Sequence, residues 1–112
     1  MKPRIMYVEH KGDGLSGTAR IGRVSFSATG RTFYYRGMAL RKIKGYKRNC
    51  VDVATGIGYW ISGCKRSGGD RLYPGVIEID DDVREEYWTQ IRNQPECRDQ
   101  TTIRCVGKYG GR

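Results

Sequence analysis

Short runs in which apolar and polar residues alternate, separated by glycine-containing turns, make up most of the chain before residue 80. Alternation with a period of two, in runs rich in β-branched and aromatic residues, is typical of strands with one buried face. Two turns, Thr29-Gly30 and Thr55-Gly56, join neighbouring runs as hairpins. Seven runs have the character of strands: 4–9, 18–28, 31–36, 38–43, 50–54, 57–62 and 76–79.

This pattern predicts a mainly β fold, in which a small antiparallel sheet forms a curled meander or a partly open, SH3-like barrel. The motif A-T-G-x-x-aromatic-aromatic-x-x-G occurs at 28–37 and again at 54–63. Either a duplicated hairpin or repeated use of favourable turn residues explains it, and both explanations give the same fold class. In the second run, Gly22 separates Ile21 from Val24, which suggests a β-bulge.

One helix is predicted near residues 81–93, on the C-terminal side of the sheet. It begins at the aspartate run 80–82, whose carboxylates suit the positive end of the helix dipole. Asp82 and Glu85, three residues later, have the spacing of a capping box. Pro95 ends the helix. Apolar residues at positions i, i+4 and i+8 form the face that we expect to pack on the sheet: Val83, Tyr87 and Ile91.

The length of 112 residues suits a single domain. We expect this domain to cover residues 1–96, followed by a flexible, basic, glycine-containing tail over 97–112. No segment has the apolar length of a signal peptide or of a membrane span, which predicts a cytoplasmic protein without a membrane partner. In that compartment the four cysteines are expected to be reduced.

Charged residues are distributed unevenly along the chain, whose formal net charge is +9 at pH 7. Residues 1–77 carry fifteen basic and four acidic side chains, whereas residues 78–99 carry three basic and eight acidic ones. If the fold keeps these groups apart, the basic loop 44–48 and the helical segment 80–86 form opposite poles. If the helix covers the basic sheet, the two sets of charges neutralise each other.

The 38 residues between Asp13 and Asp52 contain no acidic side chain and nine lysines or arginines, interleaved with aromatic residues. Cations beside exposed aromatic rings on a β-surface contact phosphates and stack on bases. Alternatively, the aromatic residues point into the core and their basic neighbours only solvate the outer face. We predict a non-enzymatic nucleic-acid-binding module, with these contact residues: Arg31, Tyr34, Arg36, Arg41, Lys42, Lys44, Tyr46, Lys47 and Arg48.

A protein-interaction role is the alternative function. An immunity or antitoxin-type inhibitor, for example, would use the same cations to bind an acidic surface of a toxin encoded beside it. Such an inhibitor needs no chemistry of its own, because it acts by covering an active site. The positive charge disfavours inhibition of a basic nuclease, for which an acidic inhibitor would be expected.

The sequence contains no pattern typical of a catalytic or metal site. The G-x-G-x-x-G at 12–17 precedes a predicted strand, whereas a dinucleotide site requires a helix there. The four cysteines are 14, 33 and 8 positions apart, and the single histidine, His10, does not complete a zinc-ligand spacing. The acidic run at 80–86 has a structural explanation at a helix N-terminus. We therefore predict no enzymatic activity, no metal ligand and no cofactor.

Several stretches together resemble a group of small bacterial proteins of unassigned function: R-I-M-Y-V-E (4–9), A-R-I-G-R-V-S-F-S-A-T-G-R-T-F-Y-Y-R-G (19–37), Y-W-I-S-G (59–63), D-R-L-Y-P-G (70–75) and V-R-E-E-Y-W (83–88). Some members of the group carry the label 1-deoxy-D-xylulose-5-phosphate synthase, a large thiamine-dependent enzyme whose fold cannot be formed by 112 residues. The resemblance covers about residues 4–96 and implies a bacterial cytoplasmic protein, but it brings no known active site.

Overall fold

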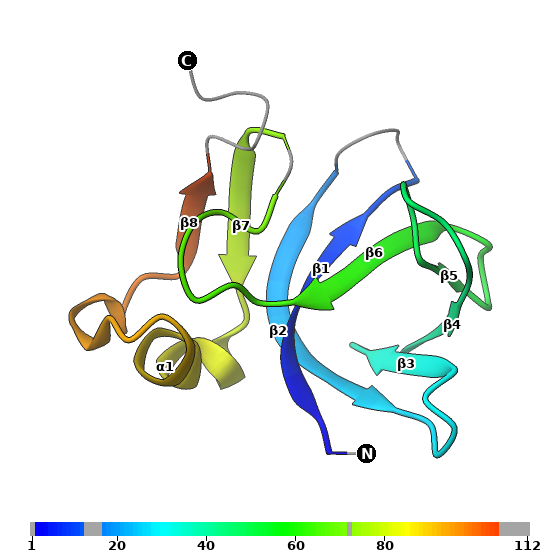
Figure 1. The fold of residues 1–112 in the computed structure, drawn as a ribbon, viewed down its shortest axis with the longest axis horizontal. Helices are drawn as coiled ribbons and strands as arrows, with labels where there is room; N and C mark the ends of the chain where they lie inside the picture. The colour runs from blue at the N-terminus through cyan, green and yellow to red at the C-terminus, as the bar shows by residue number, and fades with distance from the viewer. Residues whose placement is uncertain (1, 13–16, 72, 106–112) are drawn as a thin grey trace.

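The computed structural model describes residues 2–12, 17–71 and 73–105. This part of the chain contains eight strands and one short helical segment (Figure 1), so the prediction of a mainly β fold is confirmed. The strands are β1 Arg4–His10, β2 Ala19–Phe26, β3 Thr32–Tyr35, β4 Met38–Lys42, β5 Cys50–Asp52, β6 Gly58–Gly63, β7 Gly75–Ile79 and β8 Thr102–Cys105.

Six of the strands form a closed antiparallel barrel, in the order β1-β6-β5-β4-β3-β2. The barrel closes because β1 pairs with β6 along one edge and with β2 along the other. Its interior is filled by alternate residues of these strands, which explains the period of two in the sequence. The buried interior residues are Met6, Val8, Val24, Phe33, Tyr35, Leu40, Cys50 and Ile61.

A second core lies outside the barrel, where β7, β8 and the helical segment pack against the outer face of β1 and β2. Strand β2 therefore buries both of its faces: Ile21 belongs to this outer core and Val24 to the barrel interior. The expected bulge at Gly22 is wrong, because the register with β1 runs through Gly22 without a break. The offset between the two apolar residues reflects two cores, one on each face of the strand.

The helical segment consists of a 3₁₀ turn (Asp81–Val83), a single α-helical turn (α1, Arg84–Glu86) and a π-helical turn (Tyr87–Ile91). It packs on the outer core as predicted, with Val83 and Tyr87 fully buried and Ile91 partly buried. The predicted capping box is not formed: Asp80 occupies the N-cap position and makes no side-chain cap bond. Its carboxylate is instead bonded to residues of the barrel, as described below.

The structure differs from the prediction of a flexible tail over 97–112. Residues Pro95–Cys97 form a 3₁₀ turn, and β8 pairs with β7 in antiparallel register, with Ile103 opposite Ile77. Alternation in T-I-R-C turns Ile103 and Cys105 toward the outer core, which explains why this short run is a strand. Residues 106–112 lie outside the described part of the chain.

The repeated A-T-G motif forms two equivalent turns. Gly30 and Gly56 both have positive φ values, of 74° and 76°, which glycine adopts without strain. The aromatic pair that follows each turn has the same arrangement in both copies. Phe33 and Tyr59 pack on the barrel interior, whereas Tyr34 and Trp60 lie on its outer surface.

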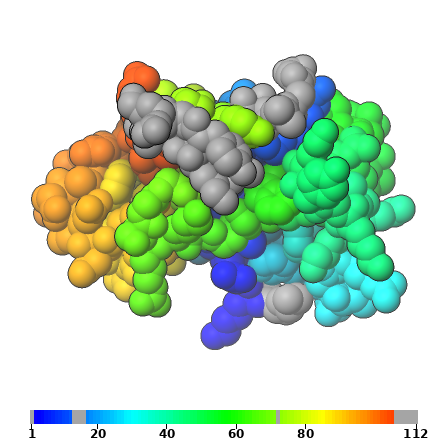
Figure 2. Space-filling view, turned by 45° about the horizontal axis from the view of Figure 1, so that its top comes forward, coloured from blue at the N-terminus to red at the C-terminus, as the bar shows by residue number. Residues whose placement is uncertain are grey.

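The barrel end formed by β3, β4 and β5 and the helical segment lie at opposite ends of the long axis of the molecule (Figure 1). In the space-filling view of Figure 2 they are again at opposite ends, with the β4–β5 region in teal and the helical segment in yellow and orange. Within the described residues, no helix is long and apolar enough to cross a membrane.

Candidate functional site

The structure brings most of the predicted contact residues together at the barrel end, on β3, β4 and the loop between β4 and β5. The backbone N–H of Lys42 donates to the carbonyl of Arg31 at 2.8 Å, and Arg41 lies opposite Thr32 in the β3–β4 register. Lys44, Lys47 and Arg48 follow directly in the loop. We call this surface the basic face and define it by Arg31, Tyr34, Arg41, Lys42, Lys44, Tyr46, Lys47 and Arg48.

The loop of the basic face is anchored to the barrel at its two ends. The backbone N–H of Ile43 donates to the carbonyl of Asn49 at 2.9 Å. The Asn49 side chain then imitates a strand residue, because it donates to the carbonyl of Ile61 at 2.7 Å and accepts from its N–H at 2.9 Å. These bonds hold the cations of the loop beside those of β4.

Two aromatic side chains of the basic face are open to solvent. Tyr34 is 44% exposed, because its neighbours across the sheet, Ser25 and Ala39, are too small to cover the ring. Tyr46, in the loop, is 86% exposed. Both rings are therefore open to solvent, and their contact with a partner stays a prediction.

The cations of the basic face are exposed, and within the described residues none of them forms an ion pair. Among the described acidic residues, Asp52 belongs to the adjoining strand β5, but it is buried and its carboxylate accepts the N–H of Ala54 at 2.9 Å. Arg48 also lies along the backbone of β6 at Gly58, where a Cβ would be 2.3 Å from the Arg48 Cδ. Within the described residues, no carboxylate pairs with the six cations of this face, so its net charge is positive.

Arg36 is separate from the basic face. It occupies the β3–β4 turn with φ of 49°, followed by Gly37 with φ of 80°, a pair typical of a type I′ hairpin. Its guanidinium donates to Asp80 Oδ1 at 3.2 Å, across 44 positions of sequence. Arg36 is therefore used within the molecule, unlike the other predicted cations.

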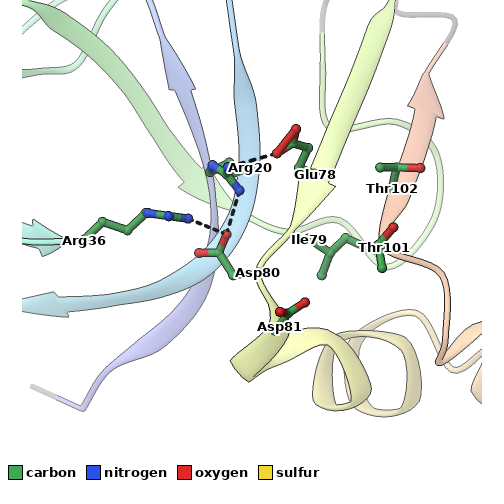
Figure 3. Close-up of a pocket in the computed structure, with 8 residues that line it drawn as sticks. All are labelled: Arg20, Arg36, Glu78, Ile79, Asp80, Asp81, Thr101 and Thr102. Atoms are coloured by element: carbon green, nitrogen blue, oxygen red, sulfur yellow. Dashed lines mark hydrogen bonds and ion pairs between the residues drawn. The ribbon is translucent and has the colours of Figure 1, made fainter.

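Asp80 lies at the junction of the barrel and the helical segment, in a pocket of about 520 Å³ (Figure 3). Its Oδ1 accepts from Arg20 and Arg36, both at 3.2 Å, and its Oδ2 accepts from the Tyr35 hydroxyl at 2.5 Å. Arg20 also contacts Glu78 at 2.9 Å. Burial, together with the bond to Asp80, raises the pKa of Tyr35, so its hydroxyl remains a donor. We call this group the Asp80 cluster.

Three other carboxylates of the acidic run are paired with arginines. Asp81 pairs with Arg84 at 3.1 Å, while Asp82 and Glu86 lie 3.9 and 3.0 Å from the guanidinium of Arg23. Arginines of the barrel and of the helix thus account for most of this acidic surface. No group of three or more potential metal ligands occurs among the described residues.

Sequence reasoning missed a second pocket, of about 460 Å³, which adjoins the basic face. We call it the Trp60 pocket. Its walls come from β1, from β6 and from two loops that are distant in sequence. Its lining includes Tyr7, Glu9, Tyr46, Lys47, Trp60 and Lys65. One signal in the sequence was Glu9, a carboxylate that directly follows four apolar residues of β1 and is buried.

The remaining candidate motifs have structural roles where they are described. His10 Nδ1 accepts the N–H of Gly12 at 3.2 Å, and the ring packs edge-on against Tyr59. The G-x-G-x-x-G motif leads into strand β2, and residues 13–16 of it lie outside the described part. All four cysteines are free thiols, and burial raises the pKa of Cys50 and Cys64 to about 12.

The fold and these sites define a small closed β-barrel with a helix-bearing lobe and a basic, aromatic surface at its far end. Comparisons with protein-family models, with curated proteins and with solved structures found no match to this chain. The resemblance to small bacterial proteins is therefore an expectation from sequence alone, and the function is argued from the sites.

Proposed function

We propose that this protein is a non-enzymatic nucleic-acid-binding module and that the basic face is its contact surface. The observation that carries the proposal is the group of six exposed cations without an acidic partner among the described residues: Arg31, Arg41, Lys42, Lys44, Lys47 and Arg48. A phosphate backbone supplies regularly spaced negative charges, and its neutralisation releases counterions.

The arrangement of the acidic residues supports the same proposal. The acidic run lies at the other end of the molecule, and arginines outside the basic face already contact its carboxylates. A polyanion that approaches the barrel end therefore meets positive charge without a nearby acidic patch that would repel it. The open rings of Tyr34 and Tyr46 add surfaces on which bases can stack.

Fluorescence anisotropy with labelled oligonucleotides tests the proposal. If all six cations contact phosphates, the logarithm of the affinity for a single strand falls with a slope of about −4 against the logarithm of salt concentration. The triple variant K42E/K44E/K47E should lose most of its affinity at low salt. Its remaining binding should show a slope that is shallower by about 2, since three contacts are lost.

A matched triple variant controls for net charge. Lys2, Arg98 and Arg104 are exposed, lie outside the basic face and form no ion pair within the described residues. K2E/R98E/R104E changes the net charge by the same amount and should weaken binding only slightly. Equal losses in the two triple variants would refute a defined contact surface. An absence of binding at low salt would refute the nucleic-acid proposal and leave an acidic protein surface as the partner to test.

A further inference from the structure

The Trp60 pocket adjoins the basic face and shares Tyr46 and Lys47 with it. Its floor is the outer surface of the β1–β6 pair, where Glu9 lies opposite Trp60 and Tyr7 lies opposite Ser62. These residues alternate with the inward-facing residues of the barrel, which is why four side chains of different character share one outer face. A volume of about 460 Å³ lies within the range of small-molecule sites.

Lys65, Asp70 and Tyr73 line one side of the pocket, and buried charged groups hold this part of the chain in place. Arg71, which is only 6% exposed, donates to the carbonyls of Gly17 and Tyr73 at 3.0 and 3.2 Å. Asp70 pairs with Arg92 at 3.2 Å, and the two side chains are 1% and 9% exposed. Buried, fully bonded groups of this kind make the wall of the pocket a preformed surface.

Glu9 gives the pocket a buried polar floor. The Tyr7 hydroxyl donates to Glu9 Oε1 at 2.5 Å, while Lys11 Nζ and the N–H of Gly17 donate to Oε2 at 3.0 and 3.2 Å. The Glu9 carboxylate is therefore neutralised by Lys11, as Asp70 is by Arg92. Burial and the contact with Glu9 raise the pKa of Tyr7, which keeps its hydroxyl a donor.

Two further cations, Lys47 and Lys65, line the pocket. Lys47 and Lys65 are exposed and have no ion-pair partner among the described residues. Because the two carboxylates are already compensated, the pocket has an excess of positive charge beside aromatic rings. This combination disfavours a cationic ligand and favours a planar ligand that carries anionic groups.

We infer that the Trp60 pocket binds an unpaired nucleobase of a single strand whose phosphates lie on the basic face, with Trp60 and Tyr46 contacting the base and Lys47 and Lys65 contacting the flanking phosphates. This inference rests on the proposed function and deepens it. A base in a duplex can reach such a pocket only after it is unstacked and unpaired. Single strands should therefore bind more tightly than the corresponding duplex.

The test compares wild type and Y46A on two single-stranded oligomers of equal length, one of thymidylate and one of abasic deoxyribose phosphate. Tyr46 is 86% exposed, so its truncation should leave the fold intact. Wild type should prefer the base-containing oligomer by roughly 10- to 100-fold, the range expected for stacking of one base. Y46A should lose most of this preference and keep the same salt dependence, because no phosphate contact is removed.

A matched control and a spectroscopic signal complete the experiment. Y34A removes the other open ring of the basic face, outside the pocket, and should lose a smaller part of the preference for bases than Y46A does. Trp88 is buried and bonded to the carbonyl of Gln100, so a change in tryptophan emission reports on Trp60. Thymidylate should quench this emission, and the abasic oligomer should not.

The outcomes separate this inference from the proposed function. Equal binding of the two oligomers by wild type, with a steep salt dependence, would refute the base pocket and leave the basic face as a phosphate-binding surface. A preference for bases that Y46A retains and Y34A loses would also refute the pocket. Failure of both oligomers to bind at low salt would overturn the proposed function and this inference together.

Discussion

Replacement of Asp80 by alanine should lower the free energy of unfolding more than replacement of any other carboxylate of the acidic run. The Asp80 side chain is only 10% exposed and bonds to three groups from the barrel. Its loss leaves the hydroxyl of Tyr35, a residue 4% exposed, without an acceptor, which costs about 1–3 kcal/mol. Arg20 keeps Glu78, and Arg36 is half-exposed, so the lost ion pairs add only about 1 kcal/mol.

We therefore expect D80A to lower the free energy of unfolding by about 2–4 kcal/mol and the melting temperature by roughly 8–25 °C. Urea denaturation and calorimetry measure both quantities. D81A is the matched control, because that side chain is 91% exposed and, within the described residues, its one ion pair is with Arg84. D81A should cost less than about 0.5 kcal/mol.

A double-mutant cycle identifies the source of the loss. Y35F alone should cost about 1–2 kcal/mol, and the double variant Y35F/D80A should cost clearly less than the two single changes together, since both remove the same hydrogen bond. A loss below about 1 kcal/mol in D80A, or additive losses in the cycle, would show that the Asp80 cluster does not hold the barrel and the helical segment together.

Three further predictions concern stability and thiol reactivity. Burial raises the pKa of Tyr7, Tyr35, Cys50, Tyr59, Cys64 and Tyr87. Between about pH 9 and about pH 12 the folded protein keeps protons on these groups that the unfolded chain releases. The free energy of unfolding should therefore fall over this range. A free energy of unfolding, measured by urea denaturation, that does not change with pH over this range would contradict the prediction. At pH 8, Cys50 and Cys64 should react slowly with Ellman's reagent in the native state, because a pKa of about 12 leaves roughly one thiol in 10⁴ ionised. Rapid modification of these two residues, detected by mass spectrometry, would be inconsistent with their burial. G22A should lower the free energy of unfolding by about 1–3 kcal/mol in the same assay, because its Cβ would lie 2.4 Å from Asp80 Oδ2. G63A is the control: the nearest atom to its Cβ would be an Arg4 nitrogen at 3.3 Å, so its loss should be less than about 1 kcal/mol.

The sequence predicts the barrel well because each of its strands has only one face in the barrel core. Alternation in T-F-Y-Y and G-Y-W-I-S-G identifies β3 and β6 and the inward direction of Phe33. Strand β2 shows where this reasoning fails. It buries both faces over part of its length, so Ile21 and Val24 do not fit an alternation with a single buried face. The sequence alone suggested a bulge, which the register with β1 does not contain.

Other differences arise from contacts between distant parts of the chain. Strand β8 has only four residues, and its stability as a strand depends on β7, about 27 positions earlier. The lining of the Trp60 pocket comes from four separate segments, which no local pattern connects. Arg36 resembles the other cations of its region in sequence, but a turn with φ of 49° directs it to Asp80.

The two poles expected from the charge pattern are unequal in the folded protein. The basic loop and the helical segment do lie at opposite ends of the molecule, as Figure 1 shows. Arg20, Arg23 and Arg36, however, contact Asp80, Asp82 and Glu86, so barrel arginines compensate much of the negative pole. The cations of the basic face have no such compensation among the described residues. Opposite poles of comparable strength would favour head-to-tail association of copies, whereas a single uncompensated positive pole favours a polyanionic partner.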